Sequence, residues 1–309
     1  MLSPSKTKNL LSPNKAKKNI LRRLSTPNEG PTGATEEERV MSSSHGNNNS
    51  QSESTVLKAL EEYCEKANLP FSKETIYRFA AFHKFHLAIT KEALIENADN
   101  HHLNLEMKGF LHRQFSTRTV FPLSGLQTRK DKLDICYIQA SRFPGPDNDN
   151  SGNHAIRVLQ SLCYVLNDLS VTKEQCKKGV AVIINMKRCE EAKFSMDFWT
   201  QLMLTLQGSL VPTTVNLVLL VDGPKWFHSK IWKTQTKPML VESFAKKCRL
   251  IDGDALLTGE HLPEGCEAHL PNAAGGWKAS SEIIEDYQDL KTFQDQQREQ
   301  GNALVQNNP

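Results

Sequence analysis

Four short apolar runs in the second half of the chain constrain the fold more than any other feature. They cover residues 133–138, 180–184, 215–221 and 248–251. Their near-continuous apolar character is typical of strands that are buried on both faces of a sheet. Helix-length stretches lie between them, at 154–169, 196–206 and 227–247. Since right-handed crossovers place such helices against the sheet, the pattern predicts an α/β domain with a mainly parallel sheet covered by helices.

A small all-helical region is expected ahead of this domain, over residues 55–115. Val56, Leu60 and Tyr63 share one side of a helix, and a break follows at 68–70, which contains Pro70. A second apolar set and a third helix follow. They are Phe79, Phe82, Phe85 and Leu87, and then residues 91–98. His83 and His86 are three residues apart but have no visible third ligand, so they are interpreted as structural and no metal site is expected.

The first 54 residues are predicted to be a disordered, Ser- and Pro-rich basic tail. Residues 1–28 carry seven Lys and Arg residues and no Asp or Glu. Such a segment buries too little apolar area to offset its ordering entropy. Ser25, in Arg-Arg-Leu-Ser, resembles a phosphorylation site. A solvated tail, a membrane-surface helix, a basic tether and an organelle transit peptide all remain open interpretations.

The C-terminal segment, residues 278–309, is expected to form a helix and a tail. Its apolar residues Ile283, Ile284, Tyr287 and Leu290 fit one helical face. That face either docks on the preceding domain or binds a partner.

The overall composition excludes several classes of protein. The seven cysteines are scattered, odd in number and never arranged as C-x-x-C, which indicates free thiols in a reducing compartment. No apolar run reaches the roughly 18 residues of a membrane span, so any membrane contact is expected to be peripheral. A net charge of +3 gives no indication of a nucleic-acid partner. We expect a cytoplasmic protein, with organelle import through the basic N-terminus left open.

Catalytic motifs are missing from the sequence. It has no phosphate-binding glycine loop, no G-x-S-x-G elbow and no H-E-x-x-H. Cys136 and Arg142 have the spacing of a phosphatase loop, but no glycine lies between them and Cys136 falls in a predicted strand, so the spacing is attributed to chance. The acidic pair Glu190 and Glu191 is interpreted as solvated. We therefore predict neither an enzyme nor a cofactor.

A basic, aromatic segment follows the apolar run 215–221, which ends in Asp-Gly-Pro. Residues 225–249 hold seven Lys and Arg residues against one acid, Glu242. In helical register Lys230, Lys233 and Lys237 share one side, and apolar residues lie on another. Pro238 must disturb this helix because it lacks an N–H group. The pattern fits a helix at an anionic membrane surface, and it fits equally well a packed helix with core aromatic residues and solvated lysines.

These residues carry a resemblance to a known family. The run Leu-Val-Asp-Gly-Pro-Lys-Trp-Phe, then Lys237-Pro238, Lys247-Cys-Arg-Leu-Ile, Leu262-Pro263, Leu270-Pro271 and Gly275-Gly276-Trp277 resembles the second half of a CRAL-TRIO lipid-binding domain. This is the family of phosphatidylinositol, tocopherol and retinaldehyde carriers. Arg78-Phe79 with Lys84-Phe85 resembles a helix of the family's N-terminal region, and 179–187 resembles one of its strands. The resemblance covers residues 55–277 and places the lipid-binding domain at 116–277.

The resemblance implies a lipid cavity whose floor is the sheet and whose lid is a gating helix. It implies cavity positions at Val180, Val182, Ile184, Leu217 and Leu219. It implies gate or membrane-contact positions at Trp226, Phe227, Lys230, Ile231, Trp232, Lys233, Lys237, Met239 and Leu240. An apolar cavity of this kind favours an acyl chain by about 0.8 kcal/mol per CH₂ group, so release requires a gate that opens into another apolar medium.

The resemblance also implies a headgroup site. Lys247 matches the family's phosphoinositide lysine, with Lys246 and Arg249 beside it, whereas Thr213 stands where the family has its partner glutamate. Val180 and Val182 replace the hydroxyls of a phosphatidylcholine pocket, which argues against that lipid.

The expected function is therefore an intracellular protein that binds one phospholipid or other hydrophobic molecule and exchanges it at membranes. The alternative is a membrane-recruited scaffold without lipid transfer. No cofactor is expected beyond the bound lipid, and a monomer is expected.

Overall fold

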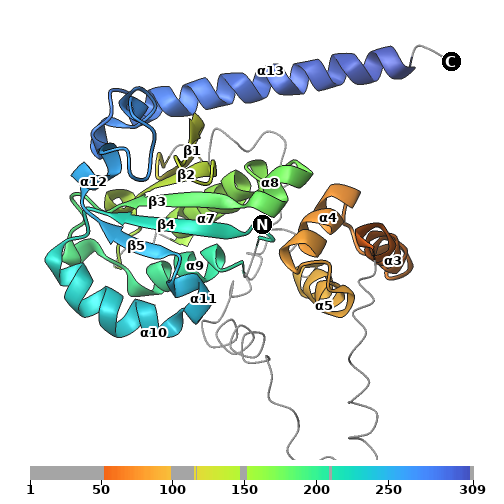
Figure 1. The fold of residues 1–309 in the computed structure, drawn as a ribbon, viewed down its shortest axis with the longest axis horizontal. Helices are drawn as coiled ribbons and strands as arrows, with labels where there is room; N and C mark the ends of the chain where they lie inside the picture. Colours follow the sequence, from red (N-terminus) through yellow and green to blue (C-terminus); the bar gives the residue numbers. More distant parts are fainter. Residues whose placement is uncertain (1–51, 99–114, 116, 147–151, 209–210, 307–309) are drawn as a thin grey trace, which may run out of the picture.

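The computed structural model describes residues 52–98, 115, 117–146, 152–208 and 211–306 (Figure 1). Ser25 and the rest of the predicted tail up to residue 51 lie outside the described residues. So does the stretch 99–114, which falls within the predicted helical region.

A five-stranded, mostly parallel sheet forms the centre of the larger domain (Figure 1). Its order follows the sequence: β1 (Val120–Gln127), β2 (Asp134–Gln139), β3 (Val180–Asn185), β4 (Val215–Val221) and β5 (Cys248–Ile251). The pairs β2–β3, β3–β4 and β4–β5 are parallel, and β1–β2 is antiparallel. All six residues of β3 are buried, as a strand covered on both faces requires. The predicted α/β class and mainly parallel sheet are confirmed.

Strand β1 is the one strand of this sheet that the apolar pattern did not predict. It contains Pro122 and Gly125, two residues that are depleted in strands. Both are tolerated because β1 is an edge strand, and its pairing with β2 is irregular between Pro122 and Gln127.

Helices cover the sheet. Helix α7 (Gly152–Asp168) packs against β1 and against α9 (Met196–Leu206). Between α7 and β3 lies the short α8 (Lys173–Lys178), which begins with a capping box formed by Thr172 and Gln175. Helix α12 (Gly253–Leu257) follows β5.

The described residues of the smaller N-terminal region form three helices: α3 (Glu53–Lys66), α4 (Lys73–Phe82) and α5 (Leu87–Ala98). Ser52 and Ser72 cap the first two, each by accepting a hydrogen bond from a backbone N–H. The helices share a small apolar core of their own, built from Val56, Leu60, Cys64, Ile76, Phe79, Ala80, Ala93 and Leu94. The predicted helical N-terminal region is therefore confirmed.

The N-terminal helices contact the sheet domain through α4 and α8 (Figure 1). Arg78 Nη1 donates a hydrogen bond to Asn167 Oδ1 at 3.0 Å, and Lys177 Nζ forms an ion pair with Glu53 at 2.8 Å.

The expectation of one helix over 227–247 is wrong. A π-helix, η5 (Phe227–Thr236), leads into a single turn, α10 (Lys237–Met239). Leu240 then has extended backbone angles, and α11 (Glu242–Ala245) is separate. Pro238 lies in the first turn of α10, where its missing N–H group is tolerated.

Helix α13 (Ser280–Gln306) is long, and it runs past the sheet domain (Figure 1). Ile283, Ile284 and Tyr287 are buried against the domain. Tyr287 donates a hydrogen bond to Asp168 at 2.7 Å. Leu290, predicted on the same face, is 43 % exposed, although the next residue, Lys291, still forms an ion pair with Asp168.

Candidate functional site

The segment between β4 and β5 forms a lid with one apolar side. We call residues 226–241 the gate segment. Phe227, Ile231, Trp232 and Thr236 are its buried residues within η5. Their spacing of four and five residues follows from i→i+5 hydrogen bonding, as in the bond from Lys237 N to Trp232 O. The π-helical geometry therefore sets which side chains face the core.

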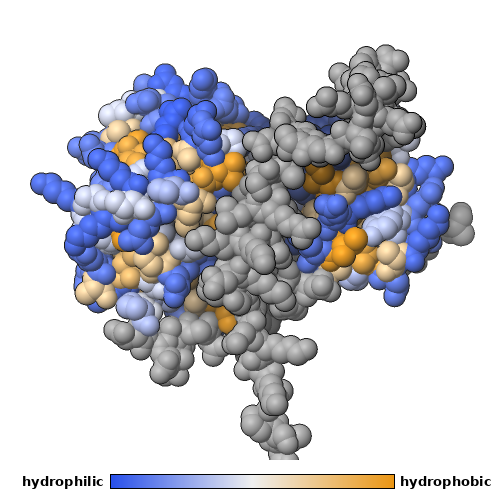
Figure 2. All heavy atoms as spheres, turned by 90° about the horizontal axis from the view of Figure 1, so that it is seen from below, coloured by the Kyte–Doolittle hydropathy of each residue, from blue (hydrophilic) through white to orange (hydrophobic). Residues whose placement is uncertain are grey.

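The lysines of this region lie on the opposite, exposed side. They are Lys225, Lys230, Lys233 and Lys237. Figure 2 views the molecule from the side of the gate segment, where hydrophilic surface predominates and hydrophobic side chains form small patches. Of the two interpretations left open by the sequence, this conformation has core aromatic residues and solvated lysines.

Three polar contacts join the gate segment to α9 and to the loop that precedes it. Trp199 Nε1 donates to Thr236 Oγ1 at 2.8 Å in the core. Val241 N donates to Gln207 Oε1 at 2.9 Å. Lys230 Nζ forms a surface ion pair with Glu191 Oε1 at 2.8 Å. The gate segment is thus tied to its neighbours at its exposed side, in its last π-turn and at its C-terminal end.

Aromatic rings fill the space where the gate segment meets α9. Trp199 contacts Phe227 with ring centroids 5.2 Å apart, and Phe194 contacts Trp226 at 5.3 Å. Phe143 packs on Phe198 at 5.0 Å. Edge-on pairs of this kind add to the free energy gained by burying the rings.

The five predicted cavity residues do not share one face of the sheet. In the parallel register Val182 pairs with Val218 and Ile184 with Leu220, whereas Leu217 and Leu219 pair with Ala181 and Ile183. Paired residues point to the same face, so Val182 and Ile184 lie on one face and Leu217 and Leu219 on the other. An irregularity between Val180 and Ala181 causes this shift. Val180, Val182, Ile184 and Leu219 are fully buried, and Leu217 is half-buried.

The remaining predicted gate residues all lie on the core side of the gate segment. Leu240 is buried at 8 % exposure, and Trp226 and Met239 are half-buried. All three pack against the main core.

Lys247 and Thr213 both lie near the start of β4. Lys247 Nζ donates to Val215 O at 2.9 Å and to Asn216 Oδ1 at 3.0 Å. Thr213 is buried, and its hydroxyl donates to Leu166 O at 3.2 Å. The Thr213 hydroxyl is therefore engaged within the protein, whereas Lys247 lies at the rim of the sheet.

Burial lowers the pKa of Lys247 below its usual value of 10.5, and the nearby charge of Lys84 lowers that pKa further. Lys84 and Phe85 have φ angles of 52° and 58°. Two consecutive non-glycine residues in the left-handed region are uncommon and mark a constrained turn. Sequence reasoning missed Lys84 and Asn216 as neighbours of Lys247, because no sequence spacing links residue 84 to residue 247.

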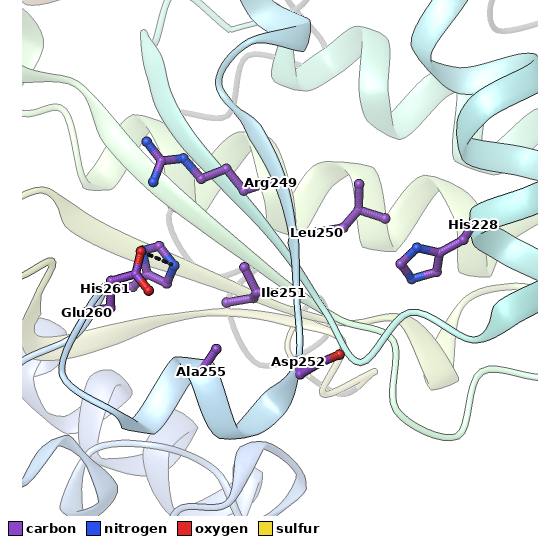
Figure 3. A pocket seen from close by; sticks show the side chains of 8 residues that line it. All are labelled: His228, Arg249, Leu250, Ile251, Asp252, Ala255, Glu260 and His261. Atoms are coloured by element: carbon purple, nitrogen blue, oxygen red, sulfur yellow. Dashed lines mark ion pairs between the residues drawn. The ribbon is translucent and has the colours of Figure 1, made fainter.

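The other two predicted headgroup residues, Lys246 and Arg249, interact with other parts of the protein than Lys247 and Thr213 do. Lys246 is exposed and forms an ion pair with Glu242 at 2.7 Å on α11. Arg249 is exposed and lines a hollow of about 370 Å³ beside β5 (Figure 3).

This hollow is lined by His228, Arg249, Leu250, Ile251, Asp252, Ala255, Glu260 and His261. Arg249, Glu260 and His261 lie on one side of β5 and His228 on the other, so the hollow follows the strand's edge (Figure 3). Charges of both signs line it, which suits a polar molecule better than an acyl chain.

The described residues contain no group of three or more His, Cys, Asp or Glu side chains placed to hold a metal ion. Within the same part of the chain, every helix is too short or too polar to span a bilayer. Cys136 is buried in β2, and this burial raises the pKa of its thiol. A phosphatase nucleophile needs a lowered pKa, so Cys136 and Arg142 do not form that site.

The fold and the site together define an α/β domain with an amphipathic lid and a helical region ahead of it. Residues 127–276 match the family model described as the CRAL/TRIO domain. This part of the chain is therefore a CRAL-TRIO domain, which extends from the end of β1 to Gly276. CRAL-TRIO domains are a lipid-binding family and are generally not catalytic. Comparison with curated proteins gave no match.

Proposed function

We propose that this protein holds a single lipid beneath the gate segment and exchanges it at membranes. The observation that carries the proposal is the two-sided gate segment. Its apolar side, with Phe227 and Trp232, packs on the core, and its exposed side carries Lys230, Lys233 and Lys237. A lid of this kind can stay closed in water and lie against anionic lipid when it opens.

The acyl part of the lipid would occupy the space now filled by the aromatic side chains of the gate segment and α9. Phe227 and Trp199 are fully buried, so a lipid enters only if the gate segment moves and takes Phe227 with it. Exchange at a membrane supplies an apolar medium for the exposed aromatic rings during that movement.

The headgroup would lie at Lys247 and Lys84. The positive charge of Lys84 helps to lower the pKa of Lys247, and an anion bound beside both ammonium groups would offset their repulsion. Asn216 Oδ1 accepts a hydrogen bond from Lys247 and so helps to orient its ammonium group, while Asn216 Nδ2 donates to Lys178 O. This arrangement favours a phosphate-bearing headgroup, such as that of a phosphoinositide, although Thr213 replaces the expected glutamate and its hydroxyl is already bonded.

Native mass spectrometry of the full chain purified from its source cells tests lipid binding. The expected result is one co-purified lipid per protein molecule. Vesicle binding with and without a phosphoinositide then tests the headgroup site, where Lys247→Met should lose the phosphoinositide preference and Lys246→Met should retain it. A Lys247→Met variant with unchanged preference would remove Lys247 from the site.

The second candidate is a membrane-recruited scaffold whose lipid cavity has been lost. The tight core favours it, because Val182, Ile184, Leu219 and Trp199 are all at 0 % exposure. A protein that stays free of lipid after incubation with cell membranes, yet still sediments with anionic vesicles, would support the scaffold over the carrier. Under either function we place the protein in the cytoplasm, peripheral on membranes.

A further inference from the structure

An ion pair connects the exposed side of the gate segment to the neighbouring loop. Lys230 Nζ lies 2.8 Å from Glu191 Oε1, at the start of the short turn η4 (Glu191–Lys193). Both side chains are more than half exposed, at 64 % and 51 %. The contact is therefore open to competition from solvent and from any charged surface.

Lys230 forms an ion pair, whereas the other lysines of the gate region form none with a described residue. Among the described residues, Lys225, Lys233 and Lys237 have no ion pair, so Lys230 alone anchors this basic side to another element. A bilayer that approaches these lysines brings phosphate groups, which accept hydrogen bonds from an ammonium group as a carboxylate does.

We propose that Glu191 is a latch on the gate segment, and that an anionic lipid surface opens the gate by taking the ammonium group of Lys230. The inference rests on the proposed function, because it adds the regulation of the same gate. In solution the carboxylate of Glu191 binds the ammonium group of Lys230, which a lipid phosphate would bind at a membrane. On an anionic membrane the four lysines face many phosphates and carboxylates at once, and Glu191 becomes one competitor among many.

The weakness of an exposed ion pair suits this role. Such a pair changes an equilibrium at most severalfold, so it biases the gate toward closure without locking it. The attraction of basic side chains to an anionic leaflet is of comparable size for each lysine, and it adds over several lysines. The membrane therefore outcompetes the latch, whereas a neutral bilayer does not.

Glu190 provides a matched control. It forms an ion pair with Lys193 at 2.7 Å within its own loop and is also exposed. Glu190→Gln and Glu191→Gln change the net charge equally and at adjacent positions. Only Glu191→Gln removes a contact with the gate segment.

Hydrogen exchange of the full chain in solution tests the latch without any lipid. Glu191→Gln should raise amide exchange over residues 227–241 about threefold. Glu190→Gln should leave that exchange at the wild-type rate. Equal exchange in wild type and Glu191→Gln, or an equal rise in both variants, would overturn the latch.

Vesicles test the release of the latch. Vesicles that contain phosphatidylserine should raise exchange over 227–241 in the wild type, and vesicles of phosphatidylcholine alone should not. Glu191→Gln should show the raised exchange with either vesicle. A wild type that responds equally to both vesicles would overturn release by an anionic surface.

Transfer of a fluorescent lipid between vesicles separates this inference from the proposed function. Glu191→Gln should transfer lipid from phosphatidylcholine vesicles about threefold faster than the wild type does. If no protein transfers or binds lipid while the exchange results hold, the carrier function fails and the latch stands. If the wild type transfers lipid and Glu191→Gln shows no gain on phosphatidylcholine vesicles, the latch fails and the carrier stands.

Discussion

Trp199 on α9 and Thr236 in the last turn of η5 are joined by a buried hydrogen bond, with the indole Nε1 donating to Oγ1 at 2.8 Å. Trp199 is fully buried, and so is Thr236. The bond satisfies the one polar atom of the tryptophan side chain, and it fixes the gate segment in rotation about its own axis. This bond joins the gate segment to its neighbours in the core, as the ion pair between Glu191 and Lys230 does at the surface.

Thr236→Val should destabilise the closed protein by about 1–3 kcal/mol, because it leaves the indole N–H group of Trp199 buried without a partner. Thr236→Ser keeps the hydroxyl and should cost less. The free energy of unfolding from urea denaturation measures both. Thr234→Val serves as the control, since Thr234 is exposed on the same element. If Thr234→Val and Thr236→Val lower the free energy of unfolding equally, the buried hydrogen bond does not stabilise the protein more than an exposed threonine does.

The pH dependence of stability should reveal the charge of Lys247. Its pKa in the folded protein is lowered by burial and by Lys84, so the folded state binds the proton less tightly than the unfolded chain does. The resulting cost to stability is present below the folded pKa, and it disappears as the pH rises toward 10.5. The stability of the wild type relative to Lys247→Met should therefore increase over that alkaline window.

Urea denaturation at several pH values measures this difference for Lys247→Met. Lys246→Met is the control, because Lys246 is an exposed neighbour. A difference between wild type and Lys247→Met that stays constant with pH would contradict the lowered pKa.

Gly276→Ala should be strongly destabilising, by roughly 3 kcal/mol or more. A Cβ atom at Gly276 would lie 2.0 Å from Leu270 O, which is backbone and has little freedom to move. The closing Gly-Gly pair is thus required by the close approach of two chain segments. Gly145→Ala is the comparison, since its nearest neighbour would be Lys193 O at 3.8 Å. Thermal unfolding of both variants tests the difference, and similar melting temperatures would refute it.

Cys189 should react slowly with alkylating reagents in the folded protein. Burial and the charge of Glu190 raise the pKa of its thiol from 9.0 to about 11. At pH 8 the thiolate fraction is then about 100-fold lower than in a thiol with the ordinary value, and the thiolate is the nucleophile. Mass spectrometry of iodoacetamide-treated protein, folded and in urea, measures the ratio. Equal labelling of Cys189 in both states would rule out the raised pKa.

Much of the sheet could be predicted from local pattern. Strands β3 and β4 are apolar over nearly their whole length, because both faces are covered, and such runs are visible without knowledge of their neighbours. Strand β1 could not be found in this way. Its Pro122 and Gly125 argue against a strand, and only its position at the sheet edge makes them acceptable.

The candidate site was less accessible to sequence reasoning. The gate positions and the five cavity positions were both expected from the family resemblance, which carries no information on strand register in this chain. The irregular pairing of β3 with β4 then divided the cavity positions between two faces. Lys84 comes near Lys247 only because the N-terminal helices pack beside the sheet domain.

By itself, the sequence determined an α/β domain with a helical region ahead of it, because apolar periodicity and turn residues act over short distances; the CRAL-TRIO family came from resemblance of the motifs between residues 215 and 277. Tertiary structure alone decided three features: the π-helical geometry of the gate segment, its bond from Thr236 to Trp199 and its ion pair from Lys230 to Glu191. The two side-chain contacts join residues that are 37 and 39 positions apart in the chain. Their free energies come from packing and pairing that no local stretch of residues contains.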